Sequence, residues 1–442
     1  MAYAPYVFVA LLAAALTFSA IGSSAGHQGL SFARPRHSPT GKSPDAIAAG
    51  DLNGDRRPDL VVVNGPALSV LLNRGDGSFV LRRDYPTTHA QAVALGDLNG
   101  DGKLDVATAN GDYSVSVLLG RGDGTFAPRR DYPIGTTFSI SVAIGDVNGD
   151  GMPDLAAVNE LANTIAVLLN AGDGTFPTRH DYATRDDPNA VAIGDLNGDR
   201  RADLVAVSDE AISVLLNRGD GGFGPRHDYA TGHWSQSVAV ADLNADGAPD
   251  LATDNSGDPG DTVSVFLNRG DGTFHRRRDY AATDAVGIAI GDLTGDGKPE
   301  LVTRGVTYND SGDSTVSVLV NRGNGSFEPK LGYPAGKNPA SLALGDLNGD
   351  RRLDMATANL EGDDVSVLLN NPNRCTVQDV WRMTVPVAKR TTAHANCRVR
   401  KVRRKYSRLV KRGRVISQKP EPFAVLPKGS PVSLVVSRGR ER

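Results

Sequence analysis

Nine residues beginning at Asp51, with the sequence DLNGDRRPD, carry side-chain oxygens at positions one, three, five and nine. These residues are Asp51, Asn53, Asp55 and Asp59, while position seven, Arg57, offers its backbone carbonyl. Oxygen ligands at alternating positions suit Ca2+, which takes about six to eight oxygens at about 2.3–2.6 Å. The spacing begins like an EF-hand loop, but the closing acid comes at position nine and strands rather than helices flank the loop. The stretch therefore predicts a calcium-binding loop that is not an EF-hand.

The motif occurs seven times, at intervals of 46 to 54 residues. A single copy would serve equally well as a hairpin turn in which Asp and Asn cap backbone amides. Seven copies favour metal, because so many converging carboxylates without a cation would repel one another, so we expect up to seven Ca2+ ions. The predicted ligands, including the position-seven carbonyls, are Asp51, Asn53, Asp55, Arg57, Asp59, Asp97, Asn99, Asp101, Lys103, Asp105, Asp146, Asn148, Asp150, Met152, Asp154, Asp195, Asn197, Asp199, Arg201, Asp203, Asp242, Asn244, Asp246, Ala248, Asp250, Asp292, Thr294, Asp296, Lys298, Glu300, Asp346, Asn348, Asp350, Arg352 and Asp354.

The elements that position these loops are short strands. Each motif follows an apolar stretch such as AVALG, and it precedes LVVVN, SVLLN and a fourth stretch that starts at an aromatic residue, FAPRRDY. Four strands in each period predict one blade of a β-propeller, and seven units predict seven blades. An open solenoid is the main alternative.

The chain ends favour a closed ring. The seventh unit passes from VSVLLN directly to NPNRC and lacks a fourth strand. The segment LSFARPRHSPT, which contains Phe32 and precedes the first motif, resembles that missing strand. We therefore predict an all-β, seven-bladed propeller closed by its N-terminal strand, which removes an exposed sheet edge.

Residues 30–370 resemble the FG-GAP/VCBS repeat family of calcium-loop propellers, which includes the integrin alpha-subunit head. The resemblance implies that the family's calcium ligands fall on positions one, three, five and nine of each loop. Two departures stand out. Arg56, Arg200 and Arg351 replace Gly at position six, so those loops must turn without the residue that turns most easily. Blade six has Thr294 and Glu300 in place of Asn and Asp, which predicts the weakest affinity there.

The C-terminal tail differs electrically from the rest of the chain. From Cys375 onward there are 18 Lys and Arg against three acids, a net charge of +15, which leaves a net charge of −18 for residues 1–374. Opposite charges predict separate domains. Seven Ca2+ ions would reduce the net charge of the propeller to −4.

The tail resembles a PASTA domain, through CTVQDVWRMTVPVAKRTTAHANCRVRKV, GRVISQKPEP and LPKGSPVSLVVSRG. We expect a small α+β domain with a helix from about Val385, capped by Thr384, on strands near Arg398, Val415 and Val432. The only cysteines, Cys375 and Cys397, predict a disulfide rather than a metal site in an exported chain. The resemblance implies peptidoglycan as a partner, and the basic run also suits anionic wall polymers. An exported chain rarely meets nucleic acid, so we expect none to bind.

The N-terminus predicts export. Residues 7–21 form an apolar run, and small residues permit cleavage after Ala25, although an uncleaved anchor is the alternative. The predicted divisions are a signal peptide at 1–25, the propeller at 26–371 and the PASTA-like domain at 372–442. We expect a secreted monomer that can associate with the cell wall.

No nucleophile elbow, zinc-protease motif or phosphate-binding loop occurs, so catalysis has little support. The RGD sequences that begin at Arg74, Arg121, Arg218 and Arg269 fall in turns, where Gly and a turn-forming Asp explain them better than adhesion. The opposite face of the ring carries irregular loops with a candidate ligand set of His89, Phe138, His233, Trp234 and Tyr308. Alternatively, Phe138 and Trp234 plug the core. We predict a wall-associated binding, adhesion or scaffold protein; the alternatives are a calcium-dependent lectin and a polysaccharide lyase.

Overall fold

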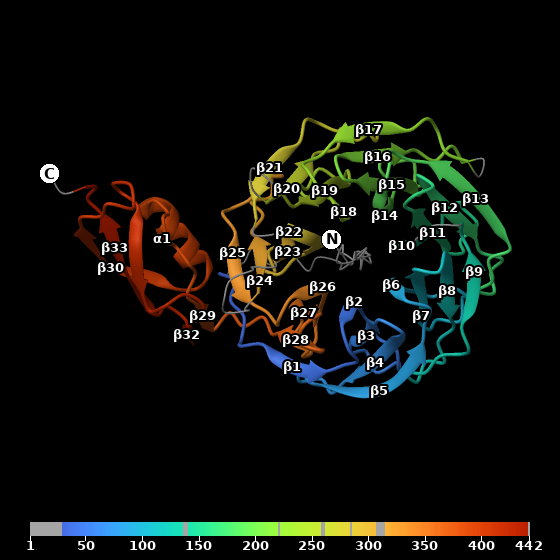
Figure 1. Cartoon of the computed structure of the whole chain (residues 1–442), viewed down its shortest axis with the longest axis horizontal. Helices are drawn as coiled ribbons and strands as arrows, with labels where there is room; N and C mark the ends of the chain where they lie inside the picture. Colours follow the sequence, from blue (N-terminus) through green and yellow to red (C-terminus); the bar gives the residue numbers. More distant parts are fainter. Residues whose placement is uncertain are drawn as a thin grey trace, which may run out of the picture.

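A computed structural model describes residues 29–135, 140–219, 222–257, 261–282, 285–305 and 314–440. Seven four-stranded antiparallel sheets form a ring, and a smaller α+β domain lies beside it (Figure 1). The predicted all-β, seven-bladed propeller with a C-terminal α+β domain is therefore confirmed. The predicted signal peptide lies outside the described residues.

The four strands of each blade are arranged side by side, from an innermost strand near the centre of the ring to an outermost strand at its rim. The innermost strands are β2 (Pro44–Gly50), β6 (Ala90–Gly96), β10 (Val142–Gly145), β14 (Pro188–Gly194), β18 (Val238–Ala241), β22 (Ala285–Gly291) and β26 (Pro339–Gly345). The second strands are β3 (Asp59–Asn64), β7 (Asp105–Asn110), β11 (Asp154–Asn159), β15 (Asp203–Ser208), β19 (Asp250–Asn255), β23 (Glu300–Gly305) and β27 (Asp354–Asn359). The third strands are β4 (Ala67–Asn73), β8 (Ser114–Leu118), β12 (Thr164–Leu169), β16 (Ala211–Leu215), β20 (Thr262–Phe266), β24 (Thr315–Leu319) and β28 (Asp364–Leu368). The outermost strands are β5 (Phe79–Pro86), β9 (Arg130–Pro133), β13 (Thr178–Ala183), β17 (His227–Ala230), β21 (Arg278–Ala281), β25 (Leu331–Pro334) and β1 (Arg36–Pro39).

Burial explains the composition of the strands. All six residues of β3, DLVVVN, are buried, because a second strand has a neighbouring blade against each face. The outermost β13, TRHDYA, is mostly exposed and correspondingly polar. Since the strands alternate in direction, the loops between strands one and two and between strands three and four emerge on one face of the ring. The other loops emerge on the opposite face, which we call the variable face.

The N-terminal strand closes the ring, as predicted. Strand β1 pairs antiparallel with β28 and completes blade seven, with Ser38 opposite Val365. Phe32 forms a bridge with Asn370 and is 1% exposed. The first and last parts of the propeller thus share one sheet, and the alternative of an open solenoid is wrong.

Tyrosine and phenylalanine rings join neighbouring blades. Each tyrosine near the end of an outermost strand meets the phenylalanine that precedes the outermost strand of the next blade, edge to face. The pairs are Tyr85–Phe126, Tyr132–Phe176, Tyr182–Phe223, Tyr229–Phe274, Tyr280–Phe327 and Tyr333–Phe32, with ring centroids 4.7–5.5 Å apart. At the junction of blades seven and one, Ser38 takes the tyrosine position, and Phe79 has no described ring partner.

The tail has its own core, around the disulfide between Cys375 and Cys397. A single helix, α1 (Val385–His394), packs on strand β30 (Arg398–Lys405), which pairs parallel with β33 (Pro431–Ser437). Strand β31 (Val415–Lys419) borders β33 on its other side, and β29 (Arg374–Thr376) pairs with β32 (Val425–Pro427). The predicted helix, strands and disulfide are confirmed. Thr384 occupies the N-cap position, as predicted, but its side-chain oxygen accepts no capping hydrogen bond from the helix.

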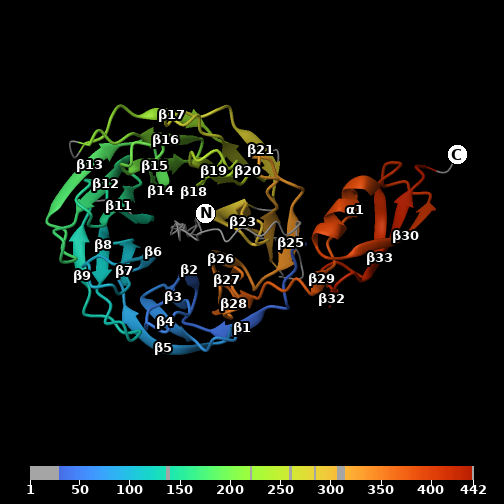
Figure 2. The same ribbon diagram turned by 180° about the vertical axis from the view of Figure 1, so that it is seen from behind.

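The two domains are in contact through the N-terminal segment. Leu30 N donates to His394 O at 2.6 Å, and Asn396 Nδ2 donates to Gly29 O at 2.6 Å. On the propeller side, Tyr333 Oη donates to Leu30 O at 2.9 Å. Gly332 N donates to Gln378 Oε1 at 2.7 Å. Figures 1 and 2 show the tail beside β25 from both sides. The segment that begins at Gly29 therefore lies between blade six and the tail.

Candidate calcium loops and binding surfaces

The first motif folds as a tight loop around the carboxylate of Asp51. Asp51 Oδ1 accepts from Gly54 N at 2.8 Å and from Asp55 N at 3.1 Å, and Asp51 Oδ2 accepts from Arg56 N at 2.7 Å. Asn53 Oδ1 accepts from Asp55 N at 2.9 Å. Oxygens at positions one, three and five thus organise the backbone of their own loop.

The other six loops repeat this geometry. In each, the position-one Asp accepts a hydrogen bond from the position-six N–H at 2.7–2.8 Å. Position six has positive φ, and the arginines there, Arg56, Arg200 and Arg351, adopt φ of 64°, 67° and 66°. These loops therefore turn without glycine, as the sequence predicts. At position four, Ala245 has φ of 64° where the other loops have Gly, a departure that aligning the seven motifs would have revealed.

The position-nine acid lies at the base of each loop. Asp59 is fully buried, and its two oxygens accept from Leu52 N at 3.1 Å and from Asn73 N at 2.8 Å. The pKa of Asp59 is raised to about 6, mainly by burial and also by the charges of Asp55 and Asp51, although these two hydrogen bonds lower it. The equivalent acids Asp154, Asp203 and Asp250 also have pKa values of about 6. Each loop therefore concentrates negative charge. In four loops the position-seven cation offsets part of it by pairing with the position-five Asp, as in Lys103–Asp101, Arg201–Asp199, Lys298–Asp296 and Arg352–Asp350.

The oxygens predicted to bind metal already accept hydrogen bonds within their own loops. Over the part of the chain that the structure describes, no group of three or more His, Cys, Asp or Glu side chains could hold a metal ion as arranged. The loop oxygens accept backbone N–H groups instead, which is the Asx-turn alternative. The donor set still fits a hard cation, because it contains only oxygens and its carboxylates repel one another. Calcium binding stays a prediction.

Blade six departs from the others at Glu300. Its Oε2 accepts from Leu293 N at 2.8 Å and from Thr294 N at 3.1 Å. Its Oε1 is buried and has no hydrogen-bond partner. Burial, followed by the charge of Asp292, raises the pKa of Glu300 to about 8. The extra methylene thus leaves one carboxylate oxygen unsatisfied inside the protein.

The candidate ligand set on the variable face is not gathered in one place. His233 Nδ1 lies 2.9 Å from Glu210 Oε1, and the next residue, Trp234, is 60% exposed. The alternative that Trp234 plugs the core is therefore wrong. His89 lies between blades one and two, whereas Trp234 lies between blades four and five, so the two belong to different junctions of the ring. Phe138 and Tyr308 lie outside the described residues.

Two buried charged residues at the variable-face end of the propeller, Asp254 and Arg304, were not predicted from the sequence. Asp254 and Arg304 occupy the fifth position of the second strands in blades five and six, where the other blades have Val or Ala. Asp254 accepts hydrogen bonds from the backbone N–H groups of Gln236, Ser237 and Gly287. Arg304 Nη1 donates to a backbone carbonyl of blade seven at 2.9 Å. Aligning the repeats would have exposed both substitutions.

The RGD sequences form hairpin turns. In the first, Arg74 N donates to Ser78 O at 2.9 Å, and Asp76 Oδ1 accepts from Ser78 N at 2.9 Å. Gly75 and Gly77 adopt φ of 87° and 78°, which require glycine. Both Gly and Asp are thus explained by the turn, as predicted. The Asp of the third copy, Asp220, lies outside the described residues.

The tail presents cations with little opposing charge. Strand β30, RVRKVRRK, is mostly exposed, and Asp379 and Glu421 are the only acids among residues 375–440. A hollow of about 250 Å³ is lined by Arg382, Leu409, Val410, Lys411 and Arg414. The Arg382 guanidinium lies 4.1 Å from the ring centroid of Trp381, which is 51% exposed, and Leu409 is 87% exposed. Exposed apolar groups beside cations are typical of binding surfaces.

Family models and solved structures support this architecture. The FG-GAP-like repeat model matches residues 51–108, 97–157, 146–206, 195–253, 255–303 and 306–357, and the PASTA domain model matches residues 376–438. Two solved structures of BBS1N in complex with ARL6DN, soaked with mercury and with lead, are each 12% identical, with TM-scores of 0.55. They cover 76% and 78% of this chain and 96% and 97% of theirs. An Agrocybe aegerita lectin specific for terminal N-acetylglucosamine is 22% identical over 72% of this chain and 86% of its own, with a TM-score of 0.49. No curated protein matches.

Proposed function

The chain belongs to the FG-GAP-like repeat family and carries a C-terminal PASTA domain, and from this premise we propose that it is an exported, calcium-stabilised binding or scaffold protein that its tail retains on the cell wall. In this proposal the propeller presents a binding surface and the tail supplies the attachment. Among the described residues no helix is long and apolar enough to span a membrane.

The sevenfold repetition of the oxygen-rich loop is the observation that carries the calcium proposal. In each loop, oxygens at positions one, three and five surround the same short backbone segment, and a buried acid lies beneath them. Asp55 and Asp51 raise the pKa of Asp59, so a cation that binds this loop would relieve their repulsion. The residues that would hold Ca2+ are those at positions one, three, five and nine, with the position-seven carbonyl. We expect blade six to bind most weakly, because Thr294 and Glu300 alter two ligands.

The charge of the tail supports the proposal of wall retention. Peptidoglycan and the anionic polymers of a cell wall carry carboxylates and phosphates, which attract a basic surface. Strand β30 and the hollow that contains Arg382, Lys411 and Arg414 supply that surface. A propeller loaded with calcium would be nearly neutral and would not oppose attachment. The contacts of the tail with Gly29 and Leu30 would hold the propeller in a defined orientation.

A calcium-dependent lectin is the second candidate. The exposed ring of Trp234 and the adjacent pair of His233 with Glu210 combine an apolar face with polar groups, which suits a sugar. Saturable binding of a glycan without bond cleavage would favour this candidate. Cleavage of a polysaccharide would instead favour the lyase alternative.

Sedimentation of the full chain with purified cell wall tests the attachment. We expect binding at low salt and substantial release at 1 M salt, where the Debye length falls to about 3 Å. Replacing Arg400, Arg403 and Arg404 of β30 with Gln should release the protein at lower salt. A matched variant with Arg130, Arg276 and Arg278 of the propeller changed to Gln loses the same charge and should bind normally. A full chain that stays in the supernatant at low salt would disprove wall retention.

A further inference from the structure

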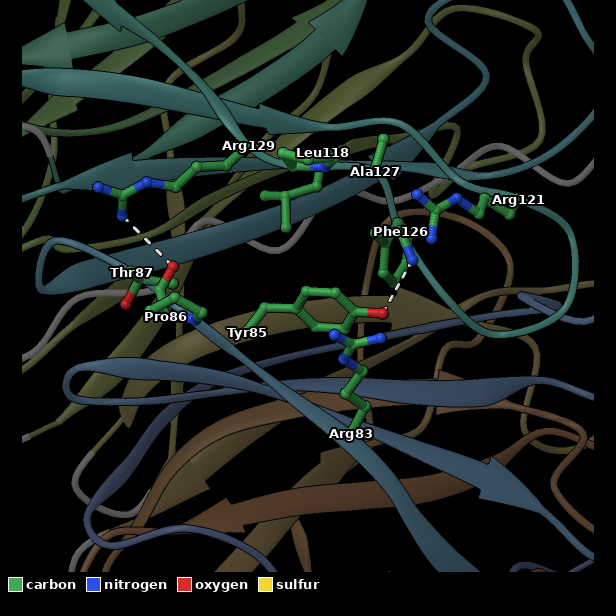
Figure 3. A pocket seen from close by; sticks show the side chains of 10 residues that line it. Arg83, Tyr85, Pro86, Thr87, Leu118, Arg121, Phe126, Ala127 and Arg129 are labelled. Atoms are coloured by element: carbon green, nitrogen blue, oxygen red, sulfur yellow. Dashed lines mark hydrogen bonds between the residues drawn. The ribbon is translucent and has the colours of Figure 1, made fainter.

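The outer rim of the propeller has a groove between blades one and two (Figure 3). Its volume is about 430 Å³, within the range of sites for small ligands. The described residues that line it are Arg83, Tyr85, Pro86, Thr87, Leu118, Arg121, Phe126, Ala127, Pro128 and Arg129. The lining therefore contains three arginines and no acid.

The floor of the groove is rigid. Tyr85 and Phe126 form an edge-to-face pair with ring centroids 5.5 Å apart, and Tyr85 Oη accepts from Phe126 N at 2.9 Å. At one end, Arg129 Nη1 donates to Pro86 O at 3.3 Å (Figure 3). Blades one and two are thus joined beneath the groove by hydrogen bonds and ring packing. A ligand would meet a surface that is already formed, which lowers the entropic cost of binding.

Two of the three arginines, Arg83 and Arg121, have guanidinium N–H groups that can bind a ligand. The Arg83 guanidinium lies 5.2 Å from the ring centroid of Tyr85. Figure 3 shows Arg121 reaching the same end of Tyr85, where its hydroxyl lies. Among the described residues neither arginine forms an ion pair, whereas Arg129 lies 3.3 Å from Asp131. Two uncompensated guanidinium groups on an acidic propeller mark a local site for an anion.

Comparison of the blades shows that this combination does not follow from the fold alone. The residue equivalent to Arg83 is Arg130, His180, His227, Arg278 or Leu331 at the next five junctions. The residue equivalent to Arg121 is Ala171 at the next junction. Between blades five and six both positions are Arg, but Arg322 donates there to Glu328 at 2.9 Å. The groove of blades one and two therefore keeps both arginines without an acid.

We infer that this groove binds a saccharide that carries a carboxylate. A guanidinium group matches a carboxylate with two parallel hydrogen bonds, and the exposed rings of Pro86 and Pro128 offer apolar surface to the C–H face of a sugar ring. An acidic peptide is less suited, because Pro86 and Pro128 in the walls have no backbone N–H with which to pair an extended strand. The site lies on the rim, apart from the calcium loops, the variable face and the tail.

Calorimetric titration of the calcium-loaded full chain with a trimer of galacturonic acid tests the inference. The fully methyl-esterified trimer has the same rings without charge, and tetraglutamate represents an acidic peptide. We expect saturable binding of the acid, at least tenfold weaker binding of the ester and weaker binding of the peptide. Equal affinity for acid and ester, or tighter binding of tetraglutamate, would overturn the inference without any variant.

Two variants of equal charge locate the site. Arg83→Gln with Arg121→Gln removes both free guanidinium groups from the groove and should weaken binding of the acid at least tenfold. Arg130→Gln with Arg269→Gln removes equivalent residues from other junctions and should change the affinity less than twofold. Equal losses in both variants would show diffuse attraction to the surface and would overturn the inference. Both variants keep the tail unchanged, so a difference between them reports on the groove, whereas sedimentation with cell wall reports on the tail.

Discussion

At the scale of single residues, arginine stands at position six of three of the candidate calcium loops, where the backbone has positive φ. Arg56 adopts φ of 64°, and its N–H donates to Asp51 Oδ2. The left-handed conformation costs a residue with a Cβ about 1–2 kcal/mol, whereas glycine adopts it freely. The hydrogen bond to Asp51 holds the loop in this conformation despite that cost.

Arg56→Gly should therefore stabilise the protein by about 0.5–1 kcal/mol, after the greater freedom of glycine in the unfolded chain is subtracted. Arg57→Gly is the matched control, because Arg57 carries the same charge at a position without positive φ. We expect it to be destabilising by about 0.5–1 kcal/mol. Urea unfolding in chelator measures both. If both variants lose stability, the left-handed strain at Arg56 is not significant.

Asp45 is a buried carboxyl at the start of β2. It is 7% exposed, and its Oδ1 has no hydrogen-bond partner. Burial raises the pKa of Asp45 from 3.8 to about 7, although the charge of Arg304 opposes this shift. The folded state therefore holds this proton more tightly than the unfolded state. The resulting stability is present below pH 4 and is lost as the pH rises toward 7.

Asp45→Asn should remove this dependence on pH. At pH 8 the variant should be more stable than the parent by an amount on the order of a few kcal/mol, since each pKa unit corresponds to about 1.4 kcal/mol. At pH 4 the two should be similar. Urea unfolding of both proteins at pH 4 and pH 8 gives the comparison. A variant that is less stable at pH 8 would show that attraction to Arg304 outweighs the cost of burial.

At the scale of elements, the stability of the ring depends most on the N-terminal strand, because this strand closes it. Phe32 packs against Tyr333 with ring centroids 4.7 Å apart, and β1 supplies the outermost strand of blade seven. Next to it, Phe79 occupies the equivalent position of blade one but is half-buried, and blade seven has Ser38 where the other blades have the partner tyrosine. The two phenylalanines therefore form a matched pair within one protein.

Phe32→Ala should destabilise the protein by about 3–5 kcal/mol, the usual cost of removing a fully buried phenylalanine. Phe79→Ala should cost less than half as much, because its ring is partly exposed and has no aromatic partner. Denaturant unfolding of the two variants measures the difference. Equal losses would indicate that the N-terminal segment contributes no more to the ring than any other outermost strand.

Much of this architecture could be predicted from the sequence, because the same pattern of strands and loops occurs in seven repeats. Strand order, ring closure at Phe32 and helix α1 each have a local signal in residue type and spacing. The docking of Gln378 on Gly332 of blade six and of Asn396 on Gly29 has none, since those contacts join residues more than 40 positions apart. The acid-free groove at Arg83 and Arg121 was missed for a similar reason. Each arginine alone looks like an ordinary surface residue, and only the pairing of two blades brings them to one site.

At the scale of the whole molecule, the two domains carry opposite net charges. The net charge is −18 for residues 1–374 and +15 for the remainder. Without a cation, the acids within each loop repel one another, and the charges of Asp55 and Asp51 add to burial in raising the pKa of Asp59. With seven Ca2+ ions the same loops would bring its net charge to −4, so calcium should decide both stability and the approach to anionic surfaces.

Thermal unfolding of the full chain in millimolar calcium and in chelator tests the proposal of calcium-stabilised folding most directly, with magnesium at the same concentration as the control. Binding to the folded loops alone adds about 2.7 kcal/mol for each site when calcium is a hundredfold above its Kd. We predict a melting midpoint that is clearly higher in calcium than in chelator, with a smaller shift in magnesium. Equal midpoints in calcium and chelator would contradict the account, and would leave the seven loops as turns held by their own hydrogen bonds.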